Sequence, residues 1–471
     1  MAFEFQHREH FDPAQAEELL RRVPAAPGVF ALRGEGAPSE PYLTHAADVR
    51  RRLRRLLAPP EAVDEQGRPV LSKRLNLRDR VRWVEWSRTG SDFESRLTLY
   101  CAARAAFGAE EARRRLRLRA PFIIRVTREH RHPRAYVTNR LTRRALQECF
   151  GPFPSRAAAE RCCDAVLDLF LLRRCWEELA VSPDHPGCVY GEMNKCLAPC
   201  KEACTQETYQ TEAARVFAFF STRGESLLAE LAAERERASE EMDFERAAQV
   251  HRQWDKVKAA ASQADEIVGP LNALRAVVVQ AASPAESTEP APDAALFLLE
   301  RGNLCGPQRL STLGVRAVRE QTAVGSSLFA QPLMLAPVPL ESADETAEPV
   351  RTASPEDRAR KALEELAQQV QDDASIEEAC DALAIFTRWY YRPGKQRAGE
   401  CLLPNAEGAW PVRRILNAAA RVVLGPPKEV SPVDRVAAAE AKKSTRTRKL
   451  HAGREDVERE VPVLPKREPT E

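Results

Sequence analysis

Four cysteines between residues 175 and 200 constrain this chain more than any other feature of its sequence. They are Cys175, Cys188, Cys196 and Cys200, separated by 12, 7 and 3 residues. Thiolates at such spacing suit a soft metal, and structural Zn²⁺ is one candidate. Buried free thiols are the alternative, and Cys204 could replace one of the four ligands. We expect the adjacent pair Cys162 and Cys163 to lie on a helix and to pack in a core.

The start of the chain bears on how its twelve cysteines are interpreted. Met-Ala-Phe-Glu-Phe-Gln-His has neither the basic nor the apolar segment of a secretory signal. No run of apolar residues reaches the roughly 18 that a membrane-spanning helix needs. We therefore expect a cytoplasmic protein, in which cysteines serve as thiols or metal ligands and not as disulfides.

Positive charge is concentrated in the N-terminal part of the chain. Residues 1–140 carry 28 basic and 18 acidic side chains, a net charge of +10. The remaining 331 residues carry 43 and 51, a net charge of −8, so the total of +2 conceals two unlike parts. The split favours an anionic partner for the N-terminal part.

Hydrophobic periodicity and turn signals predict an α+β protein of several domains. A length of 471 residues fits about three domains or more. We expect a small α/β domain at 15–107, a Cys-rich helical domain at 120–222, a helical hairpin at 226–261, an α/β region at 268–420 and a disordered tail at 425–471.

The residues around the cysteines carry the most specific motif. Cys188-Val189-Tyr190 is followed by Cys196-Leu197-Ala198-Pro199-Cys200, and upstream stand Phe150-Gly151-Pro152-Phe153 and Leu172-Arg173-Arg174-Cys175. This block resembles the UvrC family of bacterial excinucleases, which reads C-L-x-Y-x-x-x-x-C-x-A-P-C. The resemblance implies a [4Fe–4S] cluster at Cys175, Cys188, Cys196 and Cys200, with zinc as the alternative.

A second pattern lies near the N-terminus. Gly28-Val29-Phe30 is followed by Tyr42-Leu43-Thr44 and by a basic helix after Asp48, which resembles a degenerate form of the family's GIY-YIG nuclease domain. The resemblance implies catalytic roles for Tyr42 and Arg52. However, Phe30 replaces the first family tyrosine, and Leu99 stands where the family has its metal-binding glutamate.

The loss of that glutamate argues against a divalent metal at the nuclease-like site, since the metal would stabilise the largest developing charge. Phe30, Tyr42 and Leu99 are then core residues. DNA phosphates remain plausible ligands for the basic helix, and the residues expected to contact them are His45, Arg50, Arg51, Arg54 and Arg55. A merely solvated helix face is the alternative for these arginines.

A third pattern, Met242-Asp243-Phe244-Glu245 followed by Arg246-Ala247-Ala248, resembles the UVR motif L-D-F-E-x-A-A. Asp243 is a good N-cap for the second helix of a hairpin. One helix face carries Phe244, Ala247, Ala248 and His251. The resemblance implies that this face binds the matching hairpin of the helicase UvrB. An ordinary hairpin inside one domain is the alternative.

The C-terminal region resembles the segment that precedes the family's RNase-H-like nuclease. We find no aspartate-bearing strand followed by a catalytic His and Asp, so we expect a C-terminally truncated relative with a remnant at 268–420. The motifs together predict a UvrC-like component of nucleotide excision repair that binds double-stranded DNA and UvrB and has weakened or lost 3′ incision activity. Two alternatives stay open: an active divergent endonuclease that uses Tyr42, Arg52 and a displaced carboxylate such as Glu94, and a non-catalytic regulator that binds UvrB.

Overall fold

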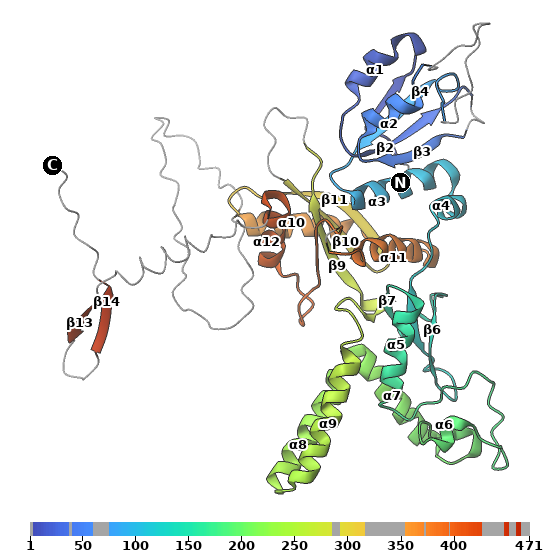
Figure 1. Cartoon of the computed structure of the whole chain (residues 1–471), viewed down its shortest axis with the longest axis vertical. Helices are drawn as coiled ribbons and strands as arrows, with labels where there is room; N and C mark the ends of the chain where they lie inside the picture. The colour runs from blue at the N-terminus through green and yellow to red at the C-terminus, as the bar shows by residue number, and fades with distance from the viewer. Residues whose placement is uncertain are drawn as a thin grey trace.

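Three four-stranded sheets and a projecting helical hairpin form most of the structure (Figure 1). In this computed structural model the described residues are 3–36, 40–59, 75–284, 293–315, 354–371, 374–394, 396–425, 447–451 and 458–462. All three sheets are antiparallel throughout.

The N-terminal sheet has the strand order β1 (His7–His10), β4 (Trp83–Arg88), β2 (Gly28–Arg33) and β3 (Tyr42–Ala46). Its core is shared with α1 (Ala16–Arg22) and α2 (Val49–Leu56). Helix α2 begins where the Asp48 carboxylate accepts a hydrogen bond from the Arg51 amide, and it buries Val49, Leu53 and Leu56. Because β1 pairs with β4, this unit begins ahead of the predicted boundary at residue 15.

The middle unit corrects the prediction of a Cys-rich helical domain at 120–222. It contains a sheet of β6 (Ala135–Thr138), β5 (Phe122–Val126), β7 (Cys149–Phe153) and β8 (Gly269–Pro270). Helices α5 (Arg156–Leu167) and α7 (Gln206–Thr222) pack on this sheet, and α6 (Val189–Glu192) lies in the cysteine loop. The sequence indicates strands at 122–126 and 136–137, which β5 and β6 confirm, but a purely helical description omits the sheet they form, and β8 comes from beyond the predicted boundary.

The helical hairpin consists of α8 (Glu225–Glu240) and α9 (Phe244–Ala261), which extend away from the sheets (Figure 1). The Asp243 carboxylate caps α9 by accepting a hydrogen bond from the Arg246 amide at 3.0 Å. Val250 and Val257 are buried along the side of α9 that joins the middle core. The opposite side of α9 has no such cover.

The C-terminal sheet has the order β11 (Asn303–Ser311), β10 (Asp293–Glu300), β9 (Arg275–Ala281) and β12 (Glu400–Leu402). Alternate residues of β9 and β10 point to opposite faces, and both faces are buried. Helices α10 (Pro355–Gln368) and α12 (Val412–Leu424) cover one face. Helix α11 (Ile376–Tyr390) covers the other.

A helix of the N-terminal unit completes that second face. Helix α3 (Asp92–Phe107), followed by α4 (Ala109–Arg115), lies between the N-terminal sheet and α11 (Figure 1). Phe93 of α3 packs against Phe297 and Trp389, with ring centroids 5.0 and 5.1 Å apart. The N-terminal unit and the C-terminal sheet therefore share one hydrophobic core.

The predicted disordered tail at 425–471 lies largely outside the described residues. Within it, β13 (Thr447–His451) pairs antiparallel with β14 (Glu458–Pro462), so the prediction was wrong for these two strands. A charged composition does not prevent local strand pairing. Among the helices of the described ranges, none has the length and apolar character needed to cross a bilayer.

Candidate functional sites

The N-terminal unit brings together two of the residues predicted to form a nuclease-like surface. The Arg52 guanidinium donates a hydrogen bond to the Tyr42 hydroxyl at 3.4 Å, and both side chains reach the surface. Phe30 lies next to Tyr42 but is fully buried, with the two ring centroids 6.4 Å apart. Phe30 therefore contributes packing, while Tyr42 and Arg52 remain accessible.

The carboxylate that lies beside His45 is occupied by arginines. Asp92, the first residue of α3, accepts hydrogen bonds from Arg96 at 2.8 Å and Arg392 at 2.6 Å. Burial alone would raise the pKa of Asp92, but these two guanidinium groups hold it below the ordinary value. His45 Nε2 lies 3.8 Å from the same carboxylate. Burial, together with the charges of Arg96 and Arg392, lowers the pKa of His45.

The displaced carboxylate considered above, Glu94, points elsewhere. Two residues along a helix lie on nearly opposite sides, so Glu94 faces away from Asp92. Glu94 is only 6% exposed, accepts a hydrogen bond from the Gly90 amide at 2.8 Å, and burial raises the pKa of its carboxyl group. It lines a cavity of about 620 Å³ between the N-terminal and C-terminal sheets, together with Arg88 and Arg309. Leu99 is buried in α3.

The basic face of α2 divides into two groups. The Arg50 guanidinium donates hydrogen bonds to the carbonyl oxygens of Val23 at 2.6 Å and Arg21 at 3.1 Å, so it ties α2 to the end of α1. Arg51, Arg54 and Arg55 are exposed, and Arg54 lies 3.8 Å from Glu17. Three of the four arginines predicted to contact DNA phosphates are thus accessible to an anionic ligand, with Arg54 also near the exposed Glu17, while Arg50 has a structural role.

The four candidate metal ligands lie on one loop between α5 and α7. Cys200 is buried and the other three are half-buried. Burial raises the pKa of the Cys196 thiol to about 11; a hydrogen bond from the Ala198 amide opposes this, and the thiols of Cys175, Cys188 and Cys200 add to it. These four thiols are therefore electrostatic neighbours.

Thiol chemistry at this loop fits a soft metal. In the parts of the chain that are described, however, no group of three or more His, Cys, Asp or Glu side chains is gathered at metal-binding geometry. Two donors already point at sulfur: the Ala198 amide lies 3.3 Å from Cys196 Sγ, and the Arg173 guanidinium lies 3.9 Å from Cys175 Sγ. Such hydrogen bonds to sulfur are typical around metal-bound thiolates.

The other cysteines near the loop differ from these four. Cys162 and Cys163 are buried in α5, and burial raises the pKa of each thiol to about 12. They pack in the middle core, as predicted. Cys204 is half-buried, and burial followed by the charge of Cys200 raises the pKa of its thiol.

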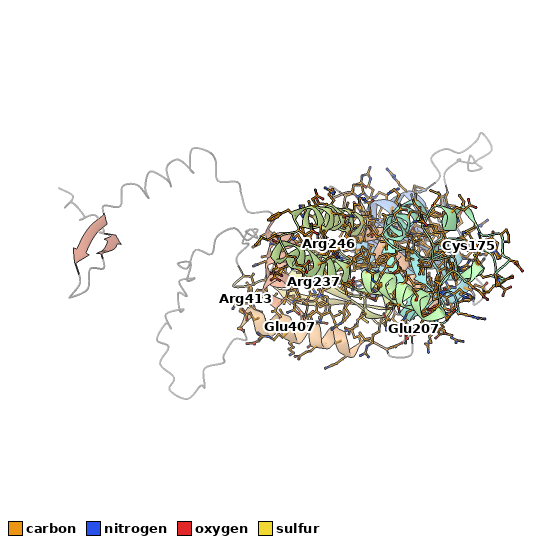
Figure 2. The ribbon with its side chains drawn as sticks, turned by 90° about the horizontal axis from the view of Figure 1, so that it is seen from below. Cys175, Glu207, Arg237, Arg246, Glu407 and Arg413 are labelled. Atoms are coloured by element: carbon orange, nitrogen blue, oxygen red, sulfur yellow. The ribbon has the colours of Figure 1, made fainter. Side chains whose placement is uncertain are left out.

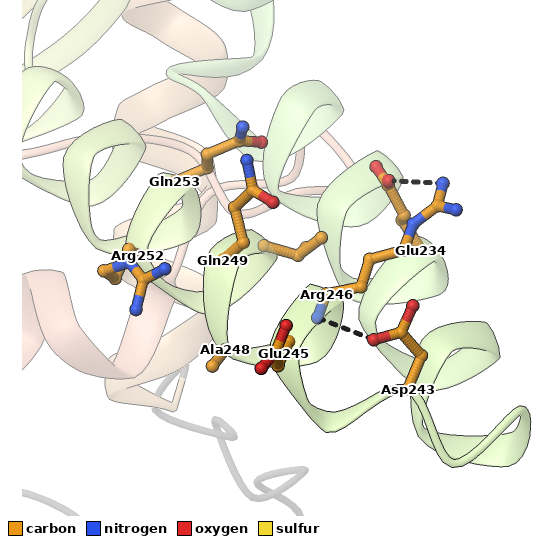
Figure 3. Close-up of a pocket in the computed structure, with 9 residues that line it drawn as sticks. Glu234, Asp243, Glu245, Arg246, Ala248, Gln249, Arg252 and Gln253 are labelled. Atoms are coloured by element: carbon orange, nitrogen blue, oxygen red, sulfur yellow. Dashed lines mark hydrogen bonds and ion pairs between the residues drawn. The ribbon is translucent and has the colours of Figure 1, made fainter.

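The hairpin presents an exposed stripe on α9. Phe244 is 71% exposed, and Ala248 and His251 are also exposed, whereas Ala247 is partly covered. Figure 3 shows the polar groove beside this stripe, where Arg246 bridges from α9 to Glu234 of α8 at 3.2 Å. Figure 2 shows Arg246 on the hairpin and Cys175 near the opposite edge of the molecule. The stripe and the cysteine loop are therefore separate surfaces.

Two features of these sites escaped the sequence analysis. Arg96 lies one turn along α3 from Asp92, but Arg392 reaches the same carboxylate from just beyond α11, and no local pattern predicts that second contact. Arg173 was recognised only as part of a motif. The burial of Arg173 beside a candidate ligand depends on its contact with Tyr209 of α7, which the local sequence does not show.

Two family models match the middle of the chain. Residues 122–219 match the family described as UvrC/Cho excinuclease, middle domain, and residues 225–259 match the UvrB/uvrC motif. No solved structure matches the chain.

Curated relatives give the same picture. UvrABC system protein C of Idiomarina loihiensis is 27% identical over 50% of this chain and 36% of the relative. The protein of the same description from Caulobacter vibrioides is 27% identical over 54% of this chain and 37% of the relative. The protein of the same description from Carboxydothermus hydrogenoformans is 25% identical over 61% of this chain and 44% of the relative. The matched part of the chain thus spans less than half the length of each of these relatives.

Proposed function

The chain belongs to the UvrC family through its middle domain and UVR motif, and on this premise we propose that it is a component of bacterial nucleotide excision repair. In this proposal it works in the cytoplasm, binds duplex DNA through the arginines of α2, and binds UvrB through the exposed stripe of α9. Its 3′ incision activity is weakened or lost.

The carboxylates of the N-terminal unit are the observation that carries the proposed loss of incision. A metal-dependent phosphodiesterase needs a carboxylate free to bind a cation beside its arginine. Here Leu99 is buried, Asp92 is neutralised by two arginines, and Glu94 faces a different cavity. Tyr42 and Arg52 remain in contact, so the surface keeps groups that hold a phosphate without the cation that would activate it.

The four cysteines are proposed to hold a [4Fe–4S] cluster, with Zn²⁺ as the alternative. When bound, either group would cross-link the loop at Cys175, Cys188, Cys196 and Cys200 and so fix its fold. The Ala198 amide would stabilise the sulfur of Cys196, because it already donates a hydrogen bond to it. Iron analysis and absorbance at about 400 nm after anaerobic purification would distinguish the cluster from zinc.

Two other functions are each favoured by one observation. The 3.4 Å contact between Arg52 and Tyr42 would suit an active divergent nuclease. The exposed Phe244 would suit a non-catalytic regulator that competes for UvrB without contacting DNA.

An incision assay separates these candidates. The chain is incubated with UvrB, a lesion-bearing duplex and Mg²⁺ or Mn²⁺, and 3′-side products are measured. We expect complex formation with DNA but no incision above background. Robust incision that disappears in Arg52→Ala, and persists in the exposed control Arg161→Ala of α5, would establish the active nuclease. UvrB binding without any DNA binding would establish the regulator.

A further inference from the structure

Arg173 is a buried cation in the middle unit. It precedes Cys175 by two residues and is only 3% exposed. Its backbone is held in place, because the Arg173 amide donates a hydrogen bond to the Tyr209 hydroxyl at 3.1 Å, and that hydroxyl donates to the Pro133 carbonyl at 2.8 Å. Tyr209 is itself fully buried in α7. The position of Arg173 is thus fixed by the core and not by its own side chain.

No carboxylate balances this charge. The guanidinium makes a hydrogen bond to the Glu177 carbonyl at 3.3 Å and approaches Cys175 Sγ at 3.9 Å, while its buried Nε has no hydrogen-bond partner. Within the described ranges, no Asp or Glu oxygen lies within 4.0 Å of it. The next residue, Arg174, pairs with Asp168 at 2.7 Å. Burying an arginine without an anion is costly, so an unpaired guanidinium here calls for an explanation.

The nearest side chain that can become an anion is the Cys175 thiol. Binding of a soft metal converts the cysteine thiols to thiolates, which brings negative charge to this loop. Cys188 and Cys196 carry the same chemistry, and all three thiols lie within electrostatic reach of one another. A metal site that holds four thiolates would supply the counter-charge that Arg173 lacks.

We propose that Arg173 is a positioning residue for the cysteine site, whose buried guanidinium is balanced by the thiolates once a metal is bound. The proposal rests on the metal site of the proposed function. It also predicts the sign of the effect of Arg173 on stability: the side chain destabilises the metal-free protein and stabilises the metal-loaded one. Metal loading would then be coupled to the packing of the middle unit through Arg173 and Tyr209.

Opposite effects in the two states provide the test. In Arg173→Met a side chain of similar length loses its charge, so the metal-free protein should unfold at the same temperature as wild type or a higher one. The loaded protein should unfold at a lower temperature than loaded wild type. Affinity for Co²⁺, followed by sulfur-to-cobalt charge-transfer absorbance, should fall by about 10- to 100-fold. In protein reconstituted with iron and sulfide, the midpoint potential should become more negative, because removing a nearby positive charge disfavours the reduced cluster.

Arg174→Met is the matched control. It removes an arginine that already has a carboxylate partner, so both states should lose similar stability. Arg173→Lys keeps the charge and should retain most of the Co²⁺ affinity, which covers the case in which Arg173→Met fails to fold.

Two results would overturn the proposal, and they differ from each other. If Arg173→Met loses equal stability in the metal-free and the loaded state, with unchanged Co²⁺ affinity, Arg173 is a packing residue and the metal site stands. If the wild-type full chain binds neither Co²⁺ nor iron, the proposed metal site fails, and the inference fails with it.

Discussion

At the scale of single residues, the neighbours of Asp92 determine whether the predicted nuclease-like surface can bind a cation. Asp92 could bind a cation only if its carboxylate were not already neutralised, but Arg96 and Arg392 both bond to its Oδ2, and its Oδ1 lies 3.8 Å from His45 Nε2. His45 lies beside this cluster, with its Nδ1 buried and without a hydrogen-bond partner. Burial, followed by the charge of Arg96, therefore lowers the pKa of His45 and disfavours its protonation in the folded protein, and the nearby Asp92 only partly opposes this.

This setting predicts a pH dependence of stability. The pKa of His45 is lowered in the folded state by burial and by Arg96, while an unfolded histidine titrates near 6.5. The unfolded chain then takes up the proton first, so stability that is fully present above about pH 6.5 is lost as the pH falls toward the lower folded-state pKa. We expect the urea midpoint to fall between pH 7.5 and about 5.5, and to fall less in His45→Gln. Equal slopes in the two proteins would contradict this interpretation.

At the scale of elements, α3 is the junction between the N-terminal unit and the C-terminal sheet with its helix α11. Its first residue pairs with Arg392, Phe93 lies against the C-terminal sheet, and the Tyr100 hydroxyl donates to Asp381 of α11 at 2.9 Å. Asp381 is 2% exposed and also pairs with Arg113 of α4 at 2.8 Å. Helix α3 therefore holds the N-terminal unit against α11 and the C-terminal sheet.

Breaking that junction should destabilise the chain. Asp381→Asn leaves the Arg113 guanidinium without its buried carboxylate, and removing one member of a buried ion pair costs about 3 kcal/mol or more. Urea unfolding of the full chain would measure the loss. Glu377→Gln, on the exposed side of the same helix, is the control and should change stability by less than about 0.5 kcal/mol. Similar losses in the two variants would show that the junction contributes nothing specific.

On α9, the second helix of the hairpin, a substitution can test binding to UvrB with little effect on folding. Phe244 is exposed at the start of α9, so Phe244→Ala removes no core packing. If Phe244 is an anchor for UvrB, its truncation should weaken binding by about tenfold or more, since interface aromatics often contribute at least 1–2 kcal/mol. Calorimetric titration with UvrB would measure this. Lys256→Ala, also exposed on α9, is the control, and equal affinity in both variants would exclude Phe244 as an anchor.

At the scale of the whole molecule, the elements that follow from local pattern were predictable, and their assembly was not. Asp243 caps α9 as its sequence indicated, and Cys162 and Cys163 lie on a helix and pack in a core as predicted. Strand β1 was missed because four residues with alternating burial give a weak signal, and β8 because only two residues form it. Contacts such as Tyr100 with Asp381 join residues 281 positions apart, which no local pattern specifies.

The charge asymmetry gains a different meaning in the folded molecule. Part of the positive charge of the N-terminal part is neutralised within the protein. Arg104 pairs with Glu378 and Arg113 with Asp381, and both acidic residues belong to the C-terminal part. Arg50 is likewise occupied by carbonyl oxygens. The net charge of +10 therefore overstates what is available to a polyanion. The arginines of α2 that remain accessible define a smaller surface.

That smaller surface gives a quantitative expectation for DNA binding. Each phosphate contact releases condensed counterions and contributes about −0.9 to the slope of log affinity against log salt for duplex DNA. Replacing Arg51, Arg54 and Arg55 with alanine should therefore reduce the magnitude of the slope by up to about 2.7 and weaken binding alike for all duplex sequences. Fluorescence anisotropy between about 50 and 200 mM salt would measure it. Arg161→Ala on α5 should leave the slope unchanged. Because these three arginines lie on the exposed side of α2, away from Val49 and Leu53, the triple variant should fold as the wild type does. An unchanged slope would place the DNA contacts elsewhere.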